Sequence, residues 1–494
     1  MKRILTLIAL ASATLCAMAQ APHNAAYPSD PAFKPLSEEE RGVIVDAEWN
    51  DSKIYPGTAR NIKVYVPKQY DGKTPACLLV CMDGILYQAT TVMDYLIKTG
   101  EMPVTIGVFI NPGVIKGEDG SVLRYNRSNE FDRTDAVFAS FLEQEILPLA
   151  ESLVTPDGRA IILSKDPADR AITGASSGGI CSFTAAWERP DLFSRVYCTV
   201  GTFVSMRGGH DYPALIRKTE PKPLRIYLQD GKYDAWNPLF GDWWEANQLM
   251  ESALDFAGYE LFFKWDRGGH SIKHGTMLFP DAMRWLWKGW PEKVGTGVSN
   301  NDMLRSVLAG AGEWTELEVP LEENAVLSNC SDNEIYIRYP DKFRKVDTTG
   351  NVTMLMKTRK GAAPSYDRKI AYYPGGKIIA KLDGDSNWIK QAVLLDGTYT
   401  CEEEYYWIHG KPYQMYFDTL GNLFVASDLG VQICDQNGRV RAILTLPSGP
   451  VTSLAFASDH LFVISGGKLF VRRLGHGGFV DPFITPIPKS QGQG

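Results

Sequence analysis

The first residues able to do chemistry lie in the pentapeptide Gly174-Ala175-Ser176-Ser177-Gly178. This G-x-S-x-G pattern follows a predicted strand over 170–173 and precedes a predicted helix over 177–188. A sharp turn between a strand and a helix exposes the hydroxyl of the central serine, and the glycines avoid collisions between β-carbons. The pattern therefore predicts Ser176 as a nucleophile, with an ordinary Gly/Ser loop as the structural alternative.

A serine hydroxyl needs a base that accepts its proton and an acid that orients this base. In hydrolases with this turn the three residues follow the chain order serine, acid, histidine. That order leaves His270 and His274, which both follow a predicted strand over 259–265. We predict His270, in a glycine-rich turn over 267–271, as the base. His274 is expected to line the pocket or to open the next helix, and a structural role for both is the alternative.

Two aspartates follow the predicted strand over 223–229, namely Asp230 and Asp234. The carboxyl ends of strands are where α/β sheets place their sites. Asp230 precedes a glycine and is equally typical of a turn, so we favour Asp234 as the acid and keep Asp230 as the alternative.

Other residues are expected to bind the substrate. The N–H groups of Ser177 and of Gly84, which follows a predicted strand over 76–82, would stabilise a developing negative charge. A charged loop before residue 135 and aromatic side chains after two strands supply candidates for the pocket wall. Solvated loop residues and helix packing are the structural alternatives. The candidates are Arg127, Glu130, Phe203, Trp236 and His274.

The elements that must position these residues alternate between strands and helices over 39–292. Continuous apolar runs bounded by turns are typical of strands that are covered on both faces. The alternation predicts an α/β domain with a mostly parallel sheet between helices. The expected strands are 60–66, 76–82, 104–110, 170–173, 195–200, 223–229 and 259–265, and the expected helices are 135–149, 177–188, 242–257 and 276–287.

The pattern changes after residue 292. Residues 293–314 read as a linker with a short helix, and residues 315–494 contain only short, evenly spaced strand patterns. Such spacing is typical of a propeller or another all-β module. A propeller blade needs about 40–45 residues, so the region has room for about four.

Length and charge narrow the function classes further. The chain has 494 residues, a length that suggests about two or three domains. Its net charge is -7. No basic stripe is present, so nucleic acid is not an expected partner. The run from Ile4 to Leu15, after Lys2 and Arg3, predicts a signal peptide over 1–19 that is cut after Ala19. Residues 20–38 are expected to form an extended leader. The signal peptide predicts a periplasmic or secreted location, and no integral membrane segment is expected in the mature chain.

Neither a metal nor a cofactor is expected. Seven cysteines remain after the signal peptide, and an odd number cannot pair completely within the chain. The Cys-x-x-Cys and His spacings of a zinc site are absent from the sequence.

Five segments together resemble the esterase D / enterochelin esterase (Fes-like) family, which also includes feruloyl and acetylxylan-type esterases. The resemblance covers about 40–292 and implies an α/β-hydrolase fold with Ser176 as nucleophile, His270 as base and Asp234 as acid. The segments are 80–84, 174–178, 229–234, 268–270 and 279–287.

The region from 416–426 onward is similar to gluconolactonase/regucalcin-like propellers, which bind a divalent metal through Glu, Asn and Asp. Residues 451–454 replace the segment that usually brings an asparagine ligand. Lactonase activity and the metal are therefore not expected here.

These observations favour an exported serine carboxylic-ester hydrolase that acts through an acyl-enzyme. The expected substrates are acyl or hydroxycinnamoyl esters of glycans, or siderophore-type esters. An acyltransferase of the same fold and a non-catalytic glycan-binding protein are the alternatives.

Overall fold

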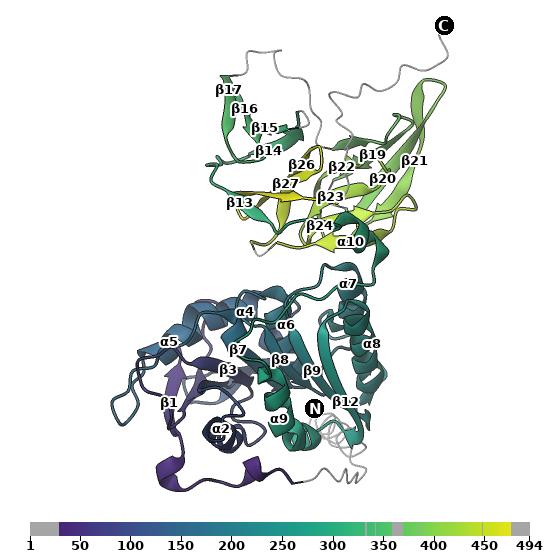
Figure 1. The fold of residues 1–494 in the computed structure, drawn as a ribbon. Coiled ribbons are helices and arrows are strands. Elements are labelled where there is room, and N and C mark those ends of the chain that lie inside the picture. The colour runs from purple at the N-terminus through teal and green to yellow at the C-terminus, as the bar shows by residue number, and fades with distance from the viewer. Residues whose placement is uncertain are drawn as a thin grey trace. The chain divides into compact units, whose positions relative to one another are not determined.

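The computed structural model describes residues 29–330, 333–340, 342–357, 369–384, 386–446 and 448–475. The predicted signal peptide and the leader before residue 29 lie outside these ranges. The chain divides into two compact units (Figure 1). One contains the residues up to Ile216 and Pro221–Val298, and the other contains Arg217–Glu220 and the residues from Ser299 onward.

The first unit is built on one eight-stranded sheet, in the order β1-β2-β4-β3-β7-β8-β9-β12. The pairs β1–β2 and β2–β4 are antiparallel, and the other neighbours are parallel. The predicted α/β class is thereby confirmed. The strands are β1 Val43–Trp49, β2 Arg60–Val66, β3 Cys77–Met82, β4 Thr105–Ile110, β7 Arg170–Ala175, β8 Arg195–Thr199, β9 Arg225–Tyr233 and β12 Glu260–Gly269.

Helices cover both faces of this sheet, which explains why its central strands are continuously apolar. Every residue of β3, β4, β7 and β8 is buried. One face packs against α4, α5, α6 and α8, and the other against α2 and α9 (Figure 1). The helices are α2 Ala89–Lys98, α4 Val137–Phe141, α5 Leu147–Ser152, α6 Ser177–Glu188, α8 Trp243–Phe256 and α9 Ile272–Trp287.

Several elements differ from the sequence prediction, including β9, which extends to Tyr233, and α9, which begins at Ile272. The helix expected over 135–149 is instead α4, a π-helical turn over Leu142–Ile146 and α5. Pro148 lacks an N–H and cannot make the usual helical bond, which accounts for the change of hydrogen-bond pattern beside it. The turn expected over 267–271 begins later, because β12 stays paired with β9 until Gly269.

The described part of the leader is not an isolated extended segment. Arg284 donates from Nη1 to Asp30 Oδ2 over 2.6 Å, and Ala32 is fully buried. Two short 3-10 turns, Pro31–Phe33 and Glu38–Glu40, fold this stretch against the first unit. Residues 30–40 are therefore an anchored part of the α/β unit, which the polar composition of the leader did not reveal.

The second unit contains, among its described residues, four antiparallel sheets of four strands each. The first strand after the linker, β13, completes the last sheet by pairing with β28. A propeller arrangement stays a prediction. The sheets are β14–β17 (Val326–Asn329, Glu334–Arg338, Lys342–Asp347, Val352–Lys357), β18–β21 (Ile370–Tyr372, Ile378–Leu382, Trp388–Leu395, Thr398–Trp407), β22–β25 (Pro412–Phe417, Leu423–Ser427, Gly430–Cys434, Val440–Leu444), and β26–β28 with β13 (Val451–Ala457, His460–Ser465, Lys468–Arg473, Thr315–Leu317).

Buried polar side chains hold three of these sheets together. Gln414 on β22 donates to the Leu327 carbonyl on β14 and accepts from the Ser453 hydroxyl on β26. The Leu327 N–H in turn donates to Ser453 Oγ over 2.8 Å. The short helix α10 (Asp302–Val307) in the predicted linker packs into the core of the same unit. Among the described helices of the chain, none is long and apolar enough to cross a membrane.

Candidate active site

Ser176 occupies a strained turn between β7 and α6. Its φ of 59° and ψ of -121° lie in a region that side chains other than glycine rarely adopt. A β-carbon on Gly174 would lie 2.3 Å from the Gly178 carbonyl oxygen, so Gly174 has no room for a side chain, and one on Gly178 would lie 3.1 Å from the Met82 β-carbon. The residues of the pentapeptide thus form the sharp turn that the sequence predicts.

Ser176, His270 and Asp234 lie in one hydrogen-bonded line. His270 Nε2 lies 2.8 Å from Ser176 Oγ, and His270 Nδ1 lies 2.5 Å from Asp234 Oδ1. The Asp234 side chain is fully buried, whereas 26% of the His270 side chain is exposed. The imidazole can therefore accept the serine proton on one side while a buried carboxylate orients it on the other.

Asp230, the alternative acid, lies behind Asp234. Burial raises the pKa of Asp230 well above its usual range, and a hydrogen bond with Asp234 raises it further. No donor reaches Asp230 Oδ2 or Asp234 Oδ2 from the other described residues. A proton on Asp230, donated to Asp234, satisfies both oxygens. The raised pKa favours the neutral form of Asp230, next to the aspartate that binds His270.

His274 belongs to a second histidine–aspartate pair. Its side chain is 5% exposed, and Nδ1 lies 2.6 Å from Asp266 Oδ1. Asp266 also accepts hydrogen bonds from the Gly268 N–H and from Gln229 Nε2. A β-carbon on Gly268 would lie 2.4 Å from His274 Nδ1, so glycine permits this approach. The pair ties the first turn of α9 to the end of β12.

The two predicted oxyanion donors differ in their surroundings. Ser177 provides the first N–H of α6, and helices leave such groups without an intrahelical partner. The Gly84 N–H instead donates to the Ile110 carbonyl over 3.2 Å, which engages it in the sheet. Only Ser177 therefore presents an N–H of the kind that a developing oxyanion needs.

Arg127 binds the loop that precedes Gly84. It donates from Nε and Nη2 to the Asp83 carboxylate over 2.7 and 2.8 Å, and from Nη2 to the Ala175 carbonyl over 3.4 Å. Burial alone would lower the pKa of Arg127, but the hydrogen bonds to Asp83 raise it. Asp83 itself has a φ of 62°. Arg127 thus fastens this strained loop to the turn that carries Ser176.

Glu130 is also part of the framework. Its fully buried carboxylate accepts two hydrogen bonds from Arg60 over 2.6 and 2.9 Å, and one from Asn126. These bonds satisfy both carboxylate oxygens, so Glu130 holds its own helix, α3 (Arg127–Phe131), to β2.

The aromatic candidates separate into buried and exposed residues. Phe203 is 1% exposed and packs edge-to-face against Phe183 in the core, so its ring is not on the surface. Trp236 is 65% exposed, on the short strand β10 (Trp236–Asn237) that directly follows Asp234. Of the two, Trp236 is available to a ligand.

Sequence reasoning missed Thr202, which lies beside Ser176. Thr202 Oγ1 lies 3.3 Å from Ser176 Oγ and accepts a hydrogen bond from Trp243 Nε1 over 3.2 Å. The ring of Trp243 packs edge-on against His270 at 5.7 Å between centroids. The position of Thr202 directly after β8, at the carboxyl edge of the sheet, was the available indication. Within the described ranges, no group of three or more His, Cys, Asp or Glu residues could hold a metal ion.

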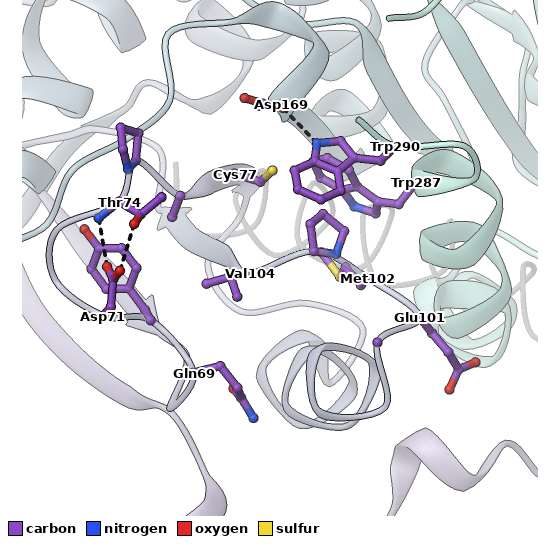
Figure 2. A pocket seen from close by; sticks show the side chains of 15 residues that line it. Gln69, Asp71, Thr74, Cys77, Glu101, Met102, Val104, Asp169, Trp287 and Trp290 are labelled. Atoms are coloured by element: carbon purple, nitrogen blue, oxygen red, sulfur yellow. Dashed lines mark hydrogen bonds between the residues drawn. The ribbon is translucent and has the colours of Figure 1, made fainter. Parts of the chain in front are cut away.

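A separate pocket of about 600 Å³ opens at the opposite edge of the sheet (Figure 2). It lies at the amino ends of β3, β4 and β7, beside Cys77, Val104 and Asp169. Two of its carboxylates are paired, since Asp169 accepts from Trp290 Nε1 and Asp71 accepts from Thr74, whereas Trp287 Nε1 has no partner among the described residues. Ser176, at the carboxyl end of β7, lies away from this pocket.

Comparison with known proteins finds similarity to esterases over part of the chain. A family model described as putative esterase matches residues 54–261. The iron(III) enterobactin esterase of Dickeya dadantii (strain 3937) is 25% identical over 290 residues, which cover 54% of this chain and 62% of that protein. This chain therefore spans less than two thirds of that relative.

Solved structures with a similar fold include the enterobactin esterase FES from Shigella flexneri, with 20% identity, a TM-score of 0.41, and coverage of 53% of this chain and 63% of that one. A ferulic acid esterase matches with 18% identity and a TM-score of 0.37 over 50% of this chain and 98% of its own. The matched residues 54–261 contain Ser176 and Asp234.

Proposed function

We propose that the protein is an exported serine carboxylic-ester hydrolase with Ser176, His270 and Asp234 as its catalytic triad. The observation that carries this proposal is the hydrogen-bonded line from Ser176 Oγ through both nitrogens of His270 to Asp234. The line ends on a strained serine beside the N-terminus of α6. The signal-peptide pattern over 1–19 supports export.

The reaction proceeds in two steps. His270 Nε2 accepts the Ser176 proton while Oγ attacks the ester carbonyl, and the Ser177 N–H binds the resulting oxyanion. The imidazolium then protonates the leaving alcohol, so the C–O bond breaks and an acyl-enzyme remains. Water, deprotonated by His270, attacks this ester and releases the acid and the free serine.

The exposed side chains near the site suit an acyl group with an apolar or aromatic part. Tyr125 lies two residues before Arg127, Trp236 lies two residues after Asp234, and they are 78% and 65% exposed. Rings of this kind stack on aromatic or sugar rings. We therefore propose acyl or hydroxycinnamoyl esters of glycans, or siderophore-type esters, as the substrates.

Burst kinetics with p-nitrophenyl acetate test the mechanism. The wild type is expected to release a burst of nitrophenol equal to the enzyme concentration, followed by slower turnover, because the acyl-enzyme accumulates. Ser176→Ala should lose both phases. Ser152→Ala is the matched control, since this exposed serine ends α5 away from the turn. Equal activity in Ser176→Ala and the wild type would overturn the proposal.

A further inference from the structure

A pocket of about 580 Å³ lies within the second unit, and its lining comes entirely from that unit. Three aromatic and three cationic side chains line it, called the aromatic wall and the cationic wall below, and no carboxylate belongs to the lining. A volume of this size is typical of small-molecule sites. The lining residues that matter here are Trp388, Tyr405, Trp407, Lys218, Arg439 and Arg441.

The aromatic wall is rigidly held. Trp388 and Trp407 pair directly across β20 and β21, so both side chains lie on the same face of the sheet. They are 37% and 39% exposed. The Tyr405 hydroxyl donates to the Gln436 carbonyl over 3.0 Å, and a β-carbon on Gly438 would lie 2.2 Å from the Tyr405 carbonyl oxygen. The turn after β24 is thus closely fitted to β21. Two tryptophans left exposed side by side in a concave site indicate a ligand surface.

The cationic wall retains donors for a ligand. Arg439 donates from Nε and Nη2 to Asp435, and a guanidinium has five N–H donors, so Nη1 is available. Arg441 binds Asp302 over 2.7 Å. Lys218 Nζ lies 3.3 Å from His409 Nε2. Burial lowers the pKa of Lys218, which shows that its ammonium group is partly desolvated. An anionic group in the pocket would relieve this cost.

We propose that this pocket binds the uronic acid residues of an acidic polysaccharide. The indole rings of Trp388 and Trp407 would cover the C–H face of a pyranose ring, and the cations would bind its carboxylate. A protein partner fits less well, because stable protein interfaces bury about 1,200–2,000 Å² and this site is a small concave pocket.

The site would place the enzyme on its substrate. Holding one chain on a polymer raises the effective concentration of the active site near esters on the same polymer. Binding itself does not depend on ester hydrolysis, so the inference stands apart from the proposed function.

Calorimetric titration of the full mature chain tests the proposal, with Ser176→Ala as the background so that no ester is cleaved. The probes are a xylo-oligosaccharide bearing one glucuronic acid, trigalacturonate, the neutral xylo-oligosaccharide and ferulate. At least one uronic probe is expected to bind, with at least tenfold weaker binding in Trp388→Ala and in Trp407→Ala. Arg439→Gln should weaken the binding of the uronic probes more than the binding of the neutral xylo-oligosaccharide.

Leu395→Ala is the matched control, because this residue is 51% exposed on the same strand as Trp388 and lies outside the pocket. Leu395→Ala should bind the uronic probes as tightly as the Ser176→Ala background protein does. Thermal unfolding of each variant reports whether the fold is retained. Failure of both uronic probes, unchanged binding in both tryptophan variants, or tighter binding of ferulate than of the uronic probes would overturn the proposal.

Discussion

The regions around His270 and His274 each contain a histidine paired with an aspartate, but the two pairs lie in different surroundings. Each histidine has Nδ1 within 2.6 Å of an aspartate, and the two lie four residues apart. His270 precedes α9 and keeps 26% of its side chain exposed, whereas His274 lies in the first helical turn and keeps 5%. Only His270 has Ser176 on its other nitrogen.

The comparison teaches that the pairing of histidine with aspartate does not by itself make a catalytic base. Asp266 accepts bonds from Gly268 and Gln229 as well, so His274 completes a structural network. Asp234 has a neighbour, Asp230, whose pKa is raised by burial, and a histidine that reaches Ser176. Access to the serine, rather than the chemistry of the pair, separates the two regions.

The largest effect is expected from His270→Asn. The amide can still donate to Asp234 but cannot accept the Ser176 proton, so kcat/KM should fall by about 10⁴-fold or more. Steady-state hydrolysis of p-nitrophenyl acetate measures the loss.

His274→Asn is the matched substitution in the other pair. We expect kcat/KM to stay within about tenfold of the wild type, with a loss of about 1–3 kcal/mol in the free energy of unfolding from the disturbed buried network. Urea denaturation measures this loss. A collapse of activity in His274→Asn and its retention in His270→Asn would reverse the assignment.

A somewhat smaller effect is expected from Asp234→Asn. Replacing the orienting carboxylate in such a triad leaves the geometry but favours the wrong histidine tautomer, at a cost of about 10⁴-fold in kcat. The pH–rate profile should also change, because the carboxylate stabilises the imidazolium. An equal loss in Asp266→Asn would show that both pairs serve catalysis and would contradict the comparison.

The smallest effect is a pH dependence of stability that comes from Asp230. Its raised pKa means that the native state holds a proton that the unfolded chain releases above about pH 4. The free energy of unfolding contributed by this group therefore falls as pH rises, by about 1.4 kcal/mol per pH unit at most, until the native carboxyl ionises.

Asp230→Asn should lack this slope while keeping a donor to Asp234. Urea denaturation at pH 5, 6, 7 and 8 compares it with the wild type and with Asp255→Asn, an exposed carboxylate on α8. Identical slopes in all three proteins would show that Asp230 is ionised in the native state.

Much of the fold could be predicted because its central strands are long, apolar and bounded by turns. Arg60–Val66 and Ser177–Glu188 coincide with the predicted ranges, since periodicity and turn residues agree there. Elements that depend on tertiary contacts were harder to predict from the sequence. The anchoring of Asp30 needs Arg284, and the π-helical turn before Leu147 reflects packing around Pro148.

The site was predictable where chain order restricts the choice, as for His270 and Asp234. It was not predictable where the direction of a side chain decides its role. Glu130 is charged like a substrate-binding residue, but its partner Arg60 lies 70 residues earlier in the chain. Phe203 follows a strand at the site edge, yet its ring turns into the core.

The pairing of β13 with β28 has a consequence for the order in which the second unit can form during synthesis. Leu317 pairs with Leu469, so more than 150 residues must emerge before the last sheet is complete. Until then β13 lacks its partner strand and presents an unpaired edge that invites association with other chains, and closing so long a loop is slow. A premature stop before residue 468 would leave this sheet permanently incomplete.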